Sequence, residues 1–238
     1  MTSVQLNSLN STQISSISTT NIIGLTTGQF SGISSTQLSA LTNTQQAVLS
    51  TTVLSAITTG QLSGLTSTDV GAFTTAQFNA LSTTLIAHLS TTQIDGVTAT
   101  QLASISTQNF GALTSAQLNG LAAAQLNALS SVVLGGMTTS QFSGLTAAQL
   151  GGLTTTSINY LSTTSFAHLT SVQIVGITAT QLGAISTTTF GGLSSTQLSY
   201  LTTTQVAAIS LTAIRGLTTS QFSGLSSVQL SSLTTTQQ

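Results

Sequence analysis

The sequence has almost no charge and lacks cysteine, proline and tryptophan. Of its 238 residues only Asp69, Asp95 and Arg215 carry a formal charge, which gives a net charge of −1. An ordinary globular domain has roughly 25% charged residues, so the composition argues against an ordinary soluble enzyme. The absence of cysteine excludes disulfides, thiolate metal sites and thiol nucleophiles. A single Lys or Arg also excludes the basic surface that a nucleic acid would need, so we expect no nucleic-acid partner.

Long apolar runs are missing as well. Ser or Thr interrupts the chain every few positions, and no stretch approaches the ~18 apolar residues of a spanning helix, so we predict no membrane span. The opening MTSVQLNSLN lacks both a basic start and an apolar run, and we expect no signal peptide there. With 39% hydrophobic residues and a mean hydropathy of +0.43, the chain is nevertheless too apolar for simple disorder and is expected to pack.

An eight-residue repeat runs through the chain. Cut into eights from Met1, the sequence gives 29 complete octads and a six-residue remainder, with no insertion or deletion. Position 1 is apolar in all 30 units, position 2 is Ser or Thr in 28, position 5 is Gln in 20 and position 6 is apolar in 28. Such unbroken phase is typical of units that stack on their neighbours. We therefore predict one solenoid over residues 1–238, without separate domains.

Each octad carries two signals for the start of a helix. Ser or Thr at position 2, followed three residues later by Gln, is the capping-box pattern. The apolar residues at positions 1 and 6 then occupy the N′ and N4 positions of a hydrophobic staple. Gly or Ala near position 8 suits a helix end. The sequence therefore predicts an all-α solenoid of very short helices, one per octad.

A β-solenoid is the alternative, because Thr, Val, Ile and Phe favour strands. In a strand, however, two apolar positions five residues apart point to opposite faces. The helices predicted instead are far below the ~12–15 residues that persist alone in water. They can exist only by stacking on one another.

A longer period is superimposed on the octads. Residues 81–145 align with 161–225 at an offset of 80, with 37 of 65 positions identical. Most octads without Gln at position 5 recur every three or four units, which predicts about 3.3 octads, or about 27 residues, per superhelical turn. It also suggests that the position-5 side chain meets a different environment once each turn. The octads in this series carry Val53, Leu85, Asn109, Val133, Ser165, Thr189 and Ala213 at position 5.

Few side chains are candidates for chemistry, and we assign no catalytic, cofactor-binding or metal-binding residue. His88 and His168 both lie at position 8, and neither has a nearby partner in sequence that would complete a metal site. Serine is abundant, but the G-x-S-x-G nucleophile motif is absent. We therefore expect no enzyme activity, no cofactor and no metal.

The remaining charged and aromatic residues have structural explanations. Asp69 takes the place of the capping Gln, where a carboxylate suits a helix N-terminus. Asp95 and Arg215, both at position 7, are expected to be solvated or to pair across subunits. Tyr160 and Tyr200 lie at position 8, where we expect them to fill space that other octads leave with Gly or Ala, a surface contact being the alternative.

Several octads resemble a known bacterial repeat. The segments LTTTQVAAI (201–209), LSTTQIDG (89–96) and LTAAQLGGLTTT (145–156) resemble the A-L-[ST]-T-x-Q-[ILV]-x arrays of large secreted or surface proteins, often described as adhesin-like. The resemblance covers the entire chain. It implies an extracellular or cell-surface location and a structural or adhesive role.

We expect a self-assembling structural subunit of an extracellular bacterial filament, fibre or sheath. The first and last octads follow the ordinary pattern instead of the polar pattern of capping repeats, which favours head-to-tail stacking. The expected partner is therefore the chain itself, as a homopolymer, with cell-surface or other extracellular matrix components as further partners. One alternative is a surface adhesin or ligand-binding rod, and a lesser one is an ice-binding protein with exposed Thr at positions 2 and 3. The adhesin would display His88, Tyr160, His168, Tyr200 and Arg215.

Overall fold

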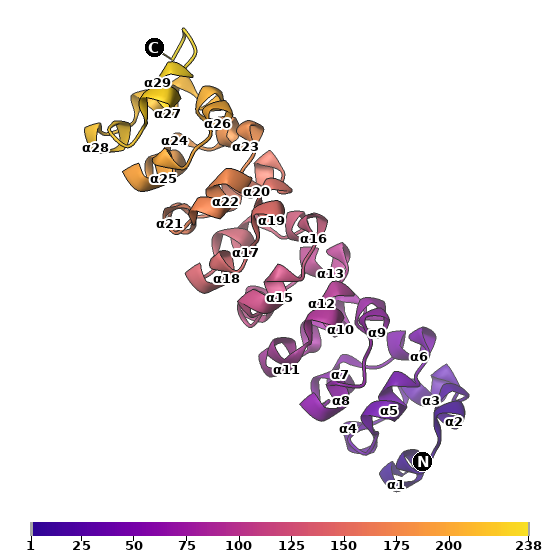
Figure 1. Cartoon of the computed structure of the whole chain (residues 1–238). Coiled ribbons are helices and arrows are strands. Elements are labelled where there is room, and N and C mark those ends of the chain that lie inside the picture. The colour runs from indigo at the N-terminus through magenta and orange to yellow at the C-terminus, as the bar shows by residue number, and fades with distance from the viewer. Residues whose placement is uncertain (1, 238) are drawn as a thin grey trace. The chain divides into compact units, whose positions relative to one another are not determined.

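The chain folds into a repeating array of very short α-helices (Figure 1). A computed structural model describes residues 2–237, in which each of the 29 complete octads forms one helix of four to six residues and no strand occurs. The predicted all-α fold is therefore confirmed, and the β-solenoid alternative is wrong.

The helices fall into two compact units, Met1–Leu121 and Ala122–Gln238. The helices of the first unit are α1 (Ser3–Asn7), α2 (Ser11–Ser15), α3 (Thr19–Ile23), α4 (Thr27–Phe30), α5 (Ser35–Ser39), α6 (Asn43–Ala47), α7 (Thr51–Ser55), α8 (Thr59–Leu62), α9 (Ser67–Ala72), α10 (Thr75–Ala80), α11 (Thr83–His88), α12 (Thr91–Asp95), α13 (Ala99–Ala103), α14 (Thr107–Gly111) and α15 (Ser115–Asn119). Those of the second unit are α16 (Ala123–Asn127), α17 (Ser131–Gly135), α18 (Thr139–Ser143), α19 (Ala147–Gly151), α20 (Thr155–Tyr160), α21 (Thr163–Ala167), α22 (Ser171–Gly176), α23 (Ala179–Ala184), α24 (Thr187–Gly191), α25 (Ser195–Ser199), α26 (Thr203–Ala208), α27 (Leu211–Arg215), α28 (Thr219–Phe222) and α29 (Ser227–Ser231).

Side-chain caps start these helices, as the octad pattern predicts. In every described helix except α16, the side chain at position 2 accepts a hydrogen bond from the backbone N–H of position 5. In α12 the Gln93 N–H donates to Ser90 Oγ at 3.1 Å, and the Ser90 N–H donates to Gln93 Oε1 at 2.8 Å. Helix α16 begins after Ala122, which has no side-chain oxygen, so only the bond from its N–H to Gln125 Oε1 remains.

Positions 1 and 6 form the apolar core of each unit. Every position-1 residue from Ile33 to Ile209 is buried, and so is every position-6 residue from Leu6 to Val206. Burial of one such aliphatic or aromatic side chain is worth about 1.5–3 kcal/mol. Packing between helices therefore supplies the stability that helices of this length lack on their own.

Within each unit, helices pack against the helix three along. Helix α1 packs against α4 and α23 against α26, for example, each pair lying within one unit. The hydrogen bonds from position-5 glutamines to the preceding turn span 28 to 31 residues. One turn of the solenoid thus takes between three and four octads, and the turn length predicted from the sequence lies within this range.

The position-5 glutamines join each turn to the one before it. Gln101 is 2% exposed, and its Oε1 accepts from the Thr98 N–H at 2.7 Å. Its Nε2 donates to the carbonyl oxygens of Val70 and Phe73, both at 2.8 Å. The position-1 carbonyl, here that of Phe73, lies between two helices and has no intrahelical donor. One amide therefore caps its own helix and satisfies a buried carbonyl of the preceding turn.

We call the series of bonds from Nε2 to a position-1 carbonyl of the preceding turn the amide ladder. Its members within the two units are Gln37, Gln45, Gln61, Gln77, Gln93, Gln101, Gln117, Gln173, Gln181, Gln197, Gln205, Gln221, Gln229 and Gln237.

Octads without Gln place the replacement in the same buried position. Val53 and Leu85 are 2% and 3% exposed, as deeply buried as Gln101. The expectation that position 5 meets a different environment once each turn is therefore wrong. Val53 and Leu85 keep the packing of the ladder position but give up its hydrogen bonds, whereas Asn109 Nδ2 still donates to the Leu81 carbonyl at 3.3 Å.

Three such octads receive their cap from the neighbouring turn. Asn79 Oδ1 accepts from the Ser106 N–H at 2.9 Å, and Asn79 Nδ2 donates to the Ser104 carbonyl at 2.8 Å. The octad of Ser106 has Asn109 where a capping Gln would stand. The equivalent pairs are Asn127 with Thr154 and Asn159 with Ser186. In each case an Asn at position 7 of the preceding turn supplies the acceptor that Gln would have supplied.

Glycine at position 8 allows close packing between turns. A Cβ at Gly64 or Gly96 would overlap the backbone of Ser35 or Ser67, which belongs to the preceding turn. No glycine among residues 2–237 has a positive φ. The helices do end near position 8 as expected, but these glycines accommodate the adjacent backbone and are not left-handed caps.

Asp69 and Gln46 together replace one ladder glutamine. Asp69 stands at position 5, and its Oδ2 accepts from the Thr66 N–H at 2.7 Å. A carboxylate cannot donate to the corresponding position-1 carbonyl of the preceding turn, which is that of Leu41. Gln46, which replaces an apolar position-6 residue and is 0% exposed, donates through Nε2 to Asp69 Oδ1 at 2.8 Å and to the Leu41 carbonyl at 3.3 Å. Gln46 thus supplies the donor that Asp69 lacks, while its own Oε1 is buried without a partner among the described residues.

Replacing Gln117 by leucine should lower the free energy of unfolding by about 1–3 kcal/mol, because the buried carbonyls of Ile86 and Leu89 lose a donor. Gln13 is the matched control, because it is exposed and its Oε1 makes the capping bond to the Asn10 N–H. Gln13→Leu should cost less than half as much. Chemical denaturation followed by circular dichroism measures both changes, and equal losses would show that the ladder bond adds nothing to the cap.

Gln46→Leu should destabilise the chain although it restores the apolar consensus, because the Asp69 carboxylate then stays buried without its amide donor. A loss of about 2–3 kcal/mol is expected. Adding Asp69→Gln rebuilds the ordinary ladder and should recover at least the original stability. Denaturation of the two single variants and the double variant measures the coupling. Additive effects would mean that the two residues do not act as a pair.

Candidate functional site

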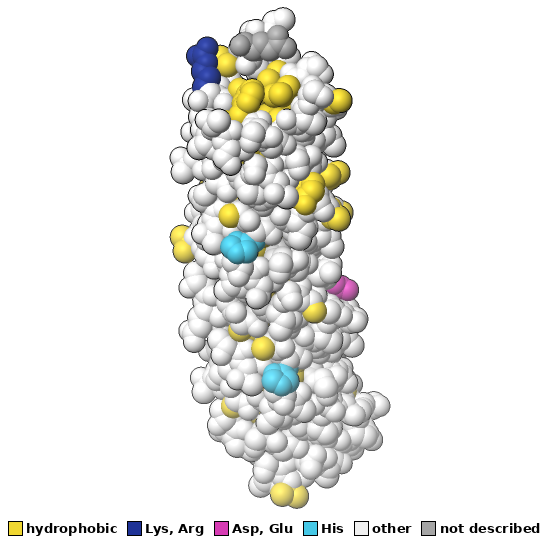
Figure 2. Space-filling model, turned by 60° about the vertical axis from the view of Figure 1, so that its left-hand side comes forward, with side chains coloured by type: hydrophobic (Ala, Val, Ile, Leu, Met, Phe, Trp, Pro, Cys, Tyr) yellow, Lys and Arg dark blue, Asp and Glu magenta, His cyan; other side chains and the backbone are white. Residues whose placement is uncertain are grey.

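The two histidines make the same local hydrogen bond. His88 Nδ1 lies 2.7 Å from the Thr84 carbonyl oxygen, and His168 Nδ1 lies 2.8 Å from that of Thr164. Because a carbonyl oxygen only accepts, Nδ1 carries the proton and Nε2 is the acceptor of the neutral ring. Both rings are exposed at the surface (Figure 2, cyan). Each can therefore offer one unshared imidazole nitrogen to a partner.

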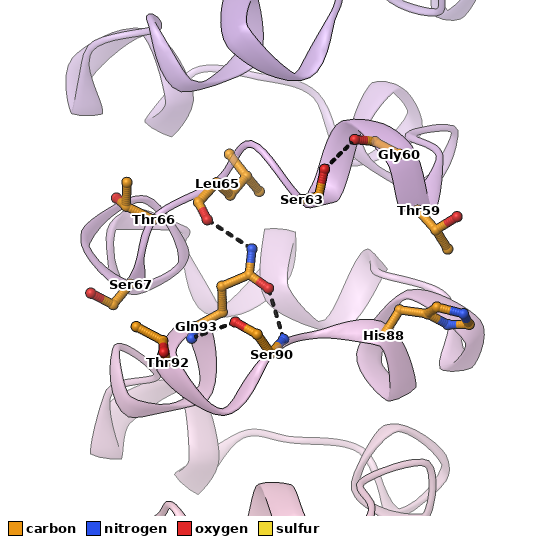
Figure 3. Close-up of a pocket in the computed structure, with 10 residues that line it drawn as sticks. All are labelled: Thr59, Gly60, Ser63, Leu65, Thr66, Ser67, His88, Ser90, Thr92 and Gln93. Carbon is orange, nitrogen blue, oxygen red and sulfur yellow. Dashed lines mark hydrogen bonds between the residues drawn. The ribbon is translucent and has the colours of Figure 1, made fainter.

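A groove of about 640 Å³ lies beside His88 in the first unit (Figure 3). The Gln93 side chain crosses it, with Nε2 donating to the Leu65 carbonyl at 2.7 Å and Oε1 accepting from the Ser90 N–H at 2.8 Å. The oxygen and the nitrogen of this amide are therefore already hydrogen-bonded within the amide ladder. The other polar side chains of the groove are hydroxyls and the His88 ring, and no charged residue lines it. The hydroxyls belong to Thr59, Ser63, Thr66, Ser67, Ser90 and Thr92.

The three charged residues lie in separate surroundings. Asp69 is buried in the helix cap where the sequence places it. Asp95 is exposed at the end of α12, and Arg215 is exposed at the end of α27, where a cation is favoured by the helix dipole. Among residues 2–237 no three His, Cys, Asp or Glu side chains gather in a way that could hold a metal ion.

Aromatic and aliphatic side chains also reach the surface (Figure 2, yellow). Tyr160 and Tyr200 are each 41% exposed, so both reach the surface while the rest of each side chain lies against the chain. Val132, Val172 and Val228 occupy position 4, where most octads have a small or polar residue, and are 64–69% exposed.

The first and last described turns expose apolar groups that inner turns bury. Leu9, Ile17 and Leu25 at position 1 are only half-buried, whereas this position is buried from Ile33 to Ile209. In the last turn Phe222 at position 6 is 43% exposed. Phe142 has the identical local sequence, TTSQFSGL, and is 0% exposed. Coverage by a following turn, not local sequence, accounts for this difference.

Ladder groups are open in the same turns. Gln5 and Gln13 use Oε1 to accept from their N-cap N–H groups, while their side-chain NH₂ groups bind no carbonyl of the described chain. Within residues 2–237 no side-chain amide of a later turn donates to the carbonyls of Leu217 and Leu225. The octad pattern predicts only a capping role for these glutamines. The signal for the second role is the absence of Glu, which completes a capping box equally well but has no N–H to donate.

Comparison with known proteins bears on the repeat itself. None of the helices in residues 2–237 is long and apolar enough to span a bilayer. A search of curated proteins gives no match. The family model described as the ALTTAQ repeat matches residues 174–211, which include the LTTTQVAAI segment. The chain is thus a repeat protein of short helices, and its residues 174–211 are a segment of the ALTTAQ repeat family, whose octad pattern the other residues repeat in phase.

Proposed function

We propose that this repeat protein is a self-assembling structural subunit of an extracellular bacterial filament, fibre or sheath. The observation that carries the proposal is the near absence of charge on the surface of a chain whose turns join by one repeated contact. The last turn exposes Phe222, which an inner turn would bury, and the first turn exposes the position-1 edge of the core. Stacking one on the other repeats the packing that holds successive turns together within each unit.

The energetics favour such stacking. Burying one fully exposed Phe or Leu side chain is worth about 1.5–3 kcal/mol. Phe222 in the last turn and the half-buried Leu9, Ile17 and Leu25 in the first turn would each gain part of this. The two stacking surfaces differ from one another, so the contact between copies is heterologous. Two stacked copies therefore still have one unused stacking surface of each kind. A heterologous contact that does not close into a ring propagates into a filament.

The surface chemistry supports the same conclusion. Because Asp69 is buried, Asp95 and Arg215 are the only exposed residues of formal charge in the described chain. Copies of the chain therefore approach with little electrostatic repulsion. The resemblance to octad arrays of secreted and surface bacterial proteins supports an extracellular location.

The purified chain should form filaments above a critical concentration, visible by negative-stain electron microscopy and sedimentation. Phe222→Ser should raise this concentration about tenfold or more, since burial of the ring is worth at least ~1.4 kcal/mol. Val132→Ser is the control, because it removes an apolar side chain that is already exposed within the same unit. A wild-type chain that stays monomeric from micromolar to millimolar concentration would overturn the proposal.

An adhesive rod is the second candidate, favoured by the exposure of the irregular side chains at positions 7 and 8. His88, Tyr160, His168, Tyr200 and Arg215 all lie at the surface, where assembly would display them in multiple copies.

Replacing Tyr160 and Tyr200 together by Ser should leave assembly intact and reduce attachment to cell or matrix surfaces, because half-exposed aromatic side chains are strong contact residues. Retained filaments can be counted by microscopy, and attachment measured with labelled filaments. The control is Val132→Ser together with Val172→Ser. If both double variants bind like the wild-type chain, the tyrosines are not adhesive contacts.

A further inference from the structure

We propose that the groove beside His88 binds a neutral saccharide through its free hydroxyl side chains and the imidazole Nε2 (Figure 3). The groove lies within the first unit, where α8 packs against α11 and α9 packs against α12 of the following turn. Its volume of about 640 Å³ falls within the range of ~300–1,000 Å³ that is usual for small-molecule sites. The inference goes beyond the proposed assembly and does not depend on it.

Several polar groups of the groove are free to bind a ligand. Three hydroxyl side chains have no hydrogen-bond partner within residues 2–237, those of Thr59, Ser67 and Thr92. The ring of His88 adds a fourth group, because its Nδ1 is used by the Thr84 carbonyl oxygen at 2.7 Å and its Nε2 remains an acceptor. In Figure 3 Thr59 and His88 lie at one end of the groove, and Ser67 and Thr92 lie at the other. A ligand that uses all four groups therefore extends along the groove.

The lining favours a ligand that is neutral and rich in hydroxyl groups. No charged side chain of the described residues lines the groove, so an ion would lose hydration there without gaining an ion pair. The Asp69 carboxylate is 6% exposed and already accepts from the Thr66 hydroxyl at 2.7 Å. A sugar hydroxyl can donate to the imidazole Nε2, and it can both donate to and accept from the free Ser and Thr hydroxyls. Leu65 and the threonine methyl groups provide apolar surface for the C–H groups of the sugar ring.

The second unit contains the same local structure around its own histidine. An offset of 80 residues relates His88 to His168, and Nδ1 of each ring lies on the carbonyl oxygen four residues earlier. The same offset relates α9 and α12 to α19 and α22, which also pack against one another. The surroundings of the two histidines can therefore be compared position by position.

Two of the free hydroxyls are missing beside the second histidine. Ala147 stands where the first unit has Ser67, and Val172 stands where it has Thr92. Val172 is 69% exposed and lines, with Ala147 and Val175, a mainly apolar groove of about 420 Å³. Sugar hydroxyls placed against these side chains would find no partner. We therefore expect the saccharide to bind in the first unit and not at the equivalent place in the second.

Binding is measured by saturation-transfer difference NMR, which detects the sugar whether the protein is dispersed or assembled. The probes are glucose, galactose, mannose and N-acetylglucosamine, each as the free sugar and as a short linear oligosaccharide. At least one neutral sugar should give a signal, and its oligosaccharide should bind more tightly, because the free groups lie at both ends of the groove. This comparison distinguishes a saccharide chain from a free sugar as the source. No signal from any neutral probe, or tighter binding of glucuronic acid or glucosamine, would overturn the proposal.

The place of binding is tested by giving the first groove the side chains of the second. In Ser67→Ala combined with Thr92→Val the affinity should fall about tenfold or more, because two hydrogen bonds are lost. His88→Ala should also weaken binding, whereas His168→Ala removes an equivalent exposed ring and should not. All four side chains are at least partly exposed, so the melting temperature should change little. Undiminished binding by the double variant, or equal losses from the two histidine variants, would overturn the site and leave the proposed function standing.

The converse variant combines Ala147→Ser with Val172→Thr and Ser140→Gly, since Ser140 has the place of Gly60 in the first unit. These changes should create a second site beside His168. Equilibrium dialysis with the tightest-binding probe should then give two saccharides bound per chain, against one for the wild-type protein. A folded variant that still binds one saccharide per chain would show that these hydroxyls do not make the site.

Discussion

The structure depends on a buried carboxamide that bonds in two directions. A helix of four to six residues has too few internal hydrogen bonds to persist, and the chain between two such helices carries a carbonyl that no helix can satisfy. Gln101 meets both needs, with its oxygen on the Thr98 N–H and its nitrogen on the Phe73 carbonyl. The apolar residues at positions 1 and 6 supply most of the burial, while the amide determines which turn packs on which.

The sequence predicts the first of these bonds and not the second. Position 2 followed by Gln three residues later indicates a capped helix, and the staple residues indicate which side packs, so the all-α fold follows from a single octad. The partner of Nε2 lies in the preceding turn. The eight-residue repeat alone does not tell how many residues form one turn, so it does not identify that partner. The spacing of irregular octads does predict that length approximately. It fails to predict the environment of position 5, because Val53 and Leu85 are as buried as Gln.

The exceptions show which part of the glutamine each turn requires. Where Asn109 replaces Gln, the missing cap acceptor is supplied by Asn79 of the previous turn. Where Asp69 replaces Gln, the acceptor remains and the donor comes from Gln46. In both cases a change at position 5 accompanies a change elsewhere in a neighbouring turn. Such pairs become recognisable in sequence only after the turn length is known, when they appear as irregular residues in neighbouring turns.

Charged residues are scarce for two different reasons, one at the buried positions and one at the surface positions of each octad. At position 5 a carboxylate faces carbonyl oxygens unless a second amide supplies the donor, as Gln46 does for Asp69. At positions 1 and 6 any charge would be desolvated, so the interior of each unit favours neutral side chains at all three positions. Most residues at positions 3, 4, 7 and 8 are instead at least partly exposed, and nothing in the packing of a single chain forbids Lys or Glu at them. Among these positions only Asp95 and Arg215 are charged. An isolated chain would gain solubility from surface charge at no cost to the ladder. The neutral outer surface is therefore better explained by contact between chains than by the fold of one chain, which is why we place assembly at the centre of the proposed function.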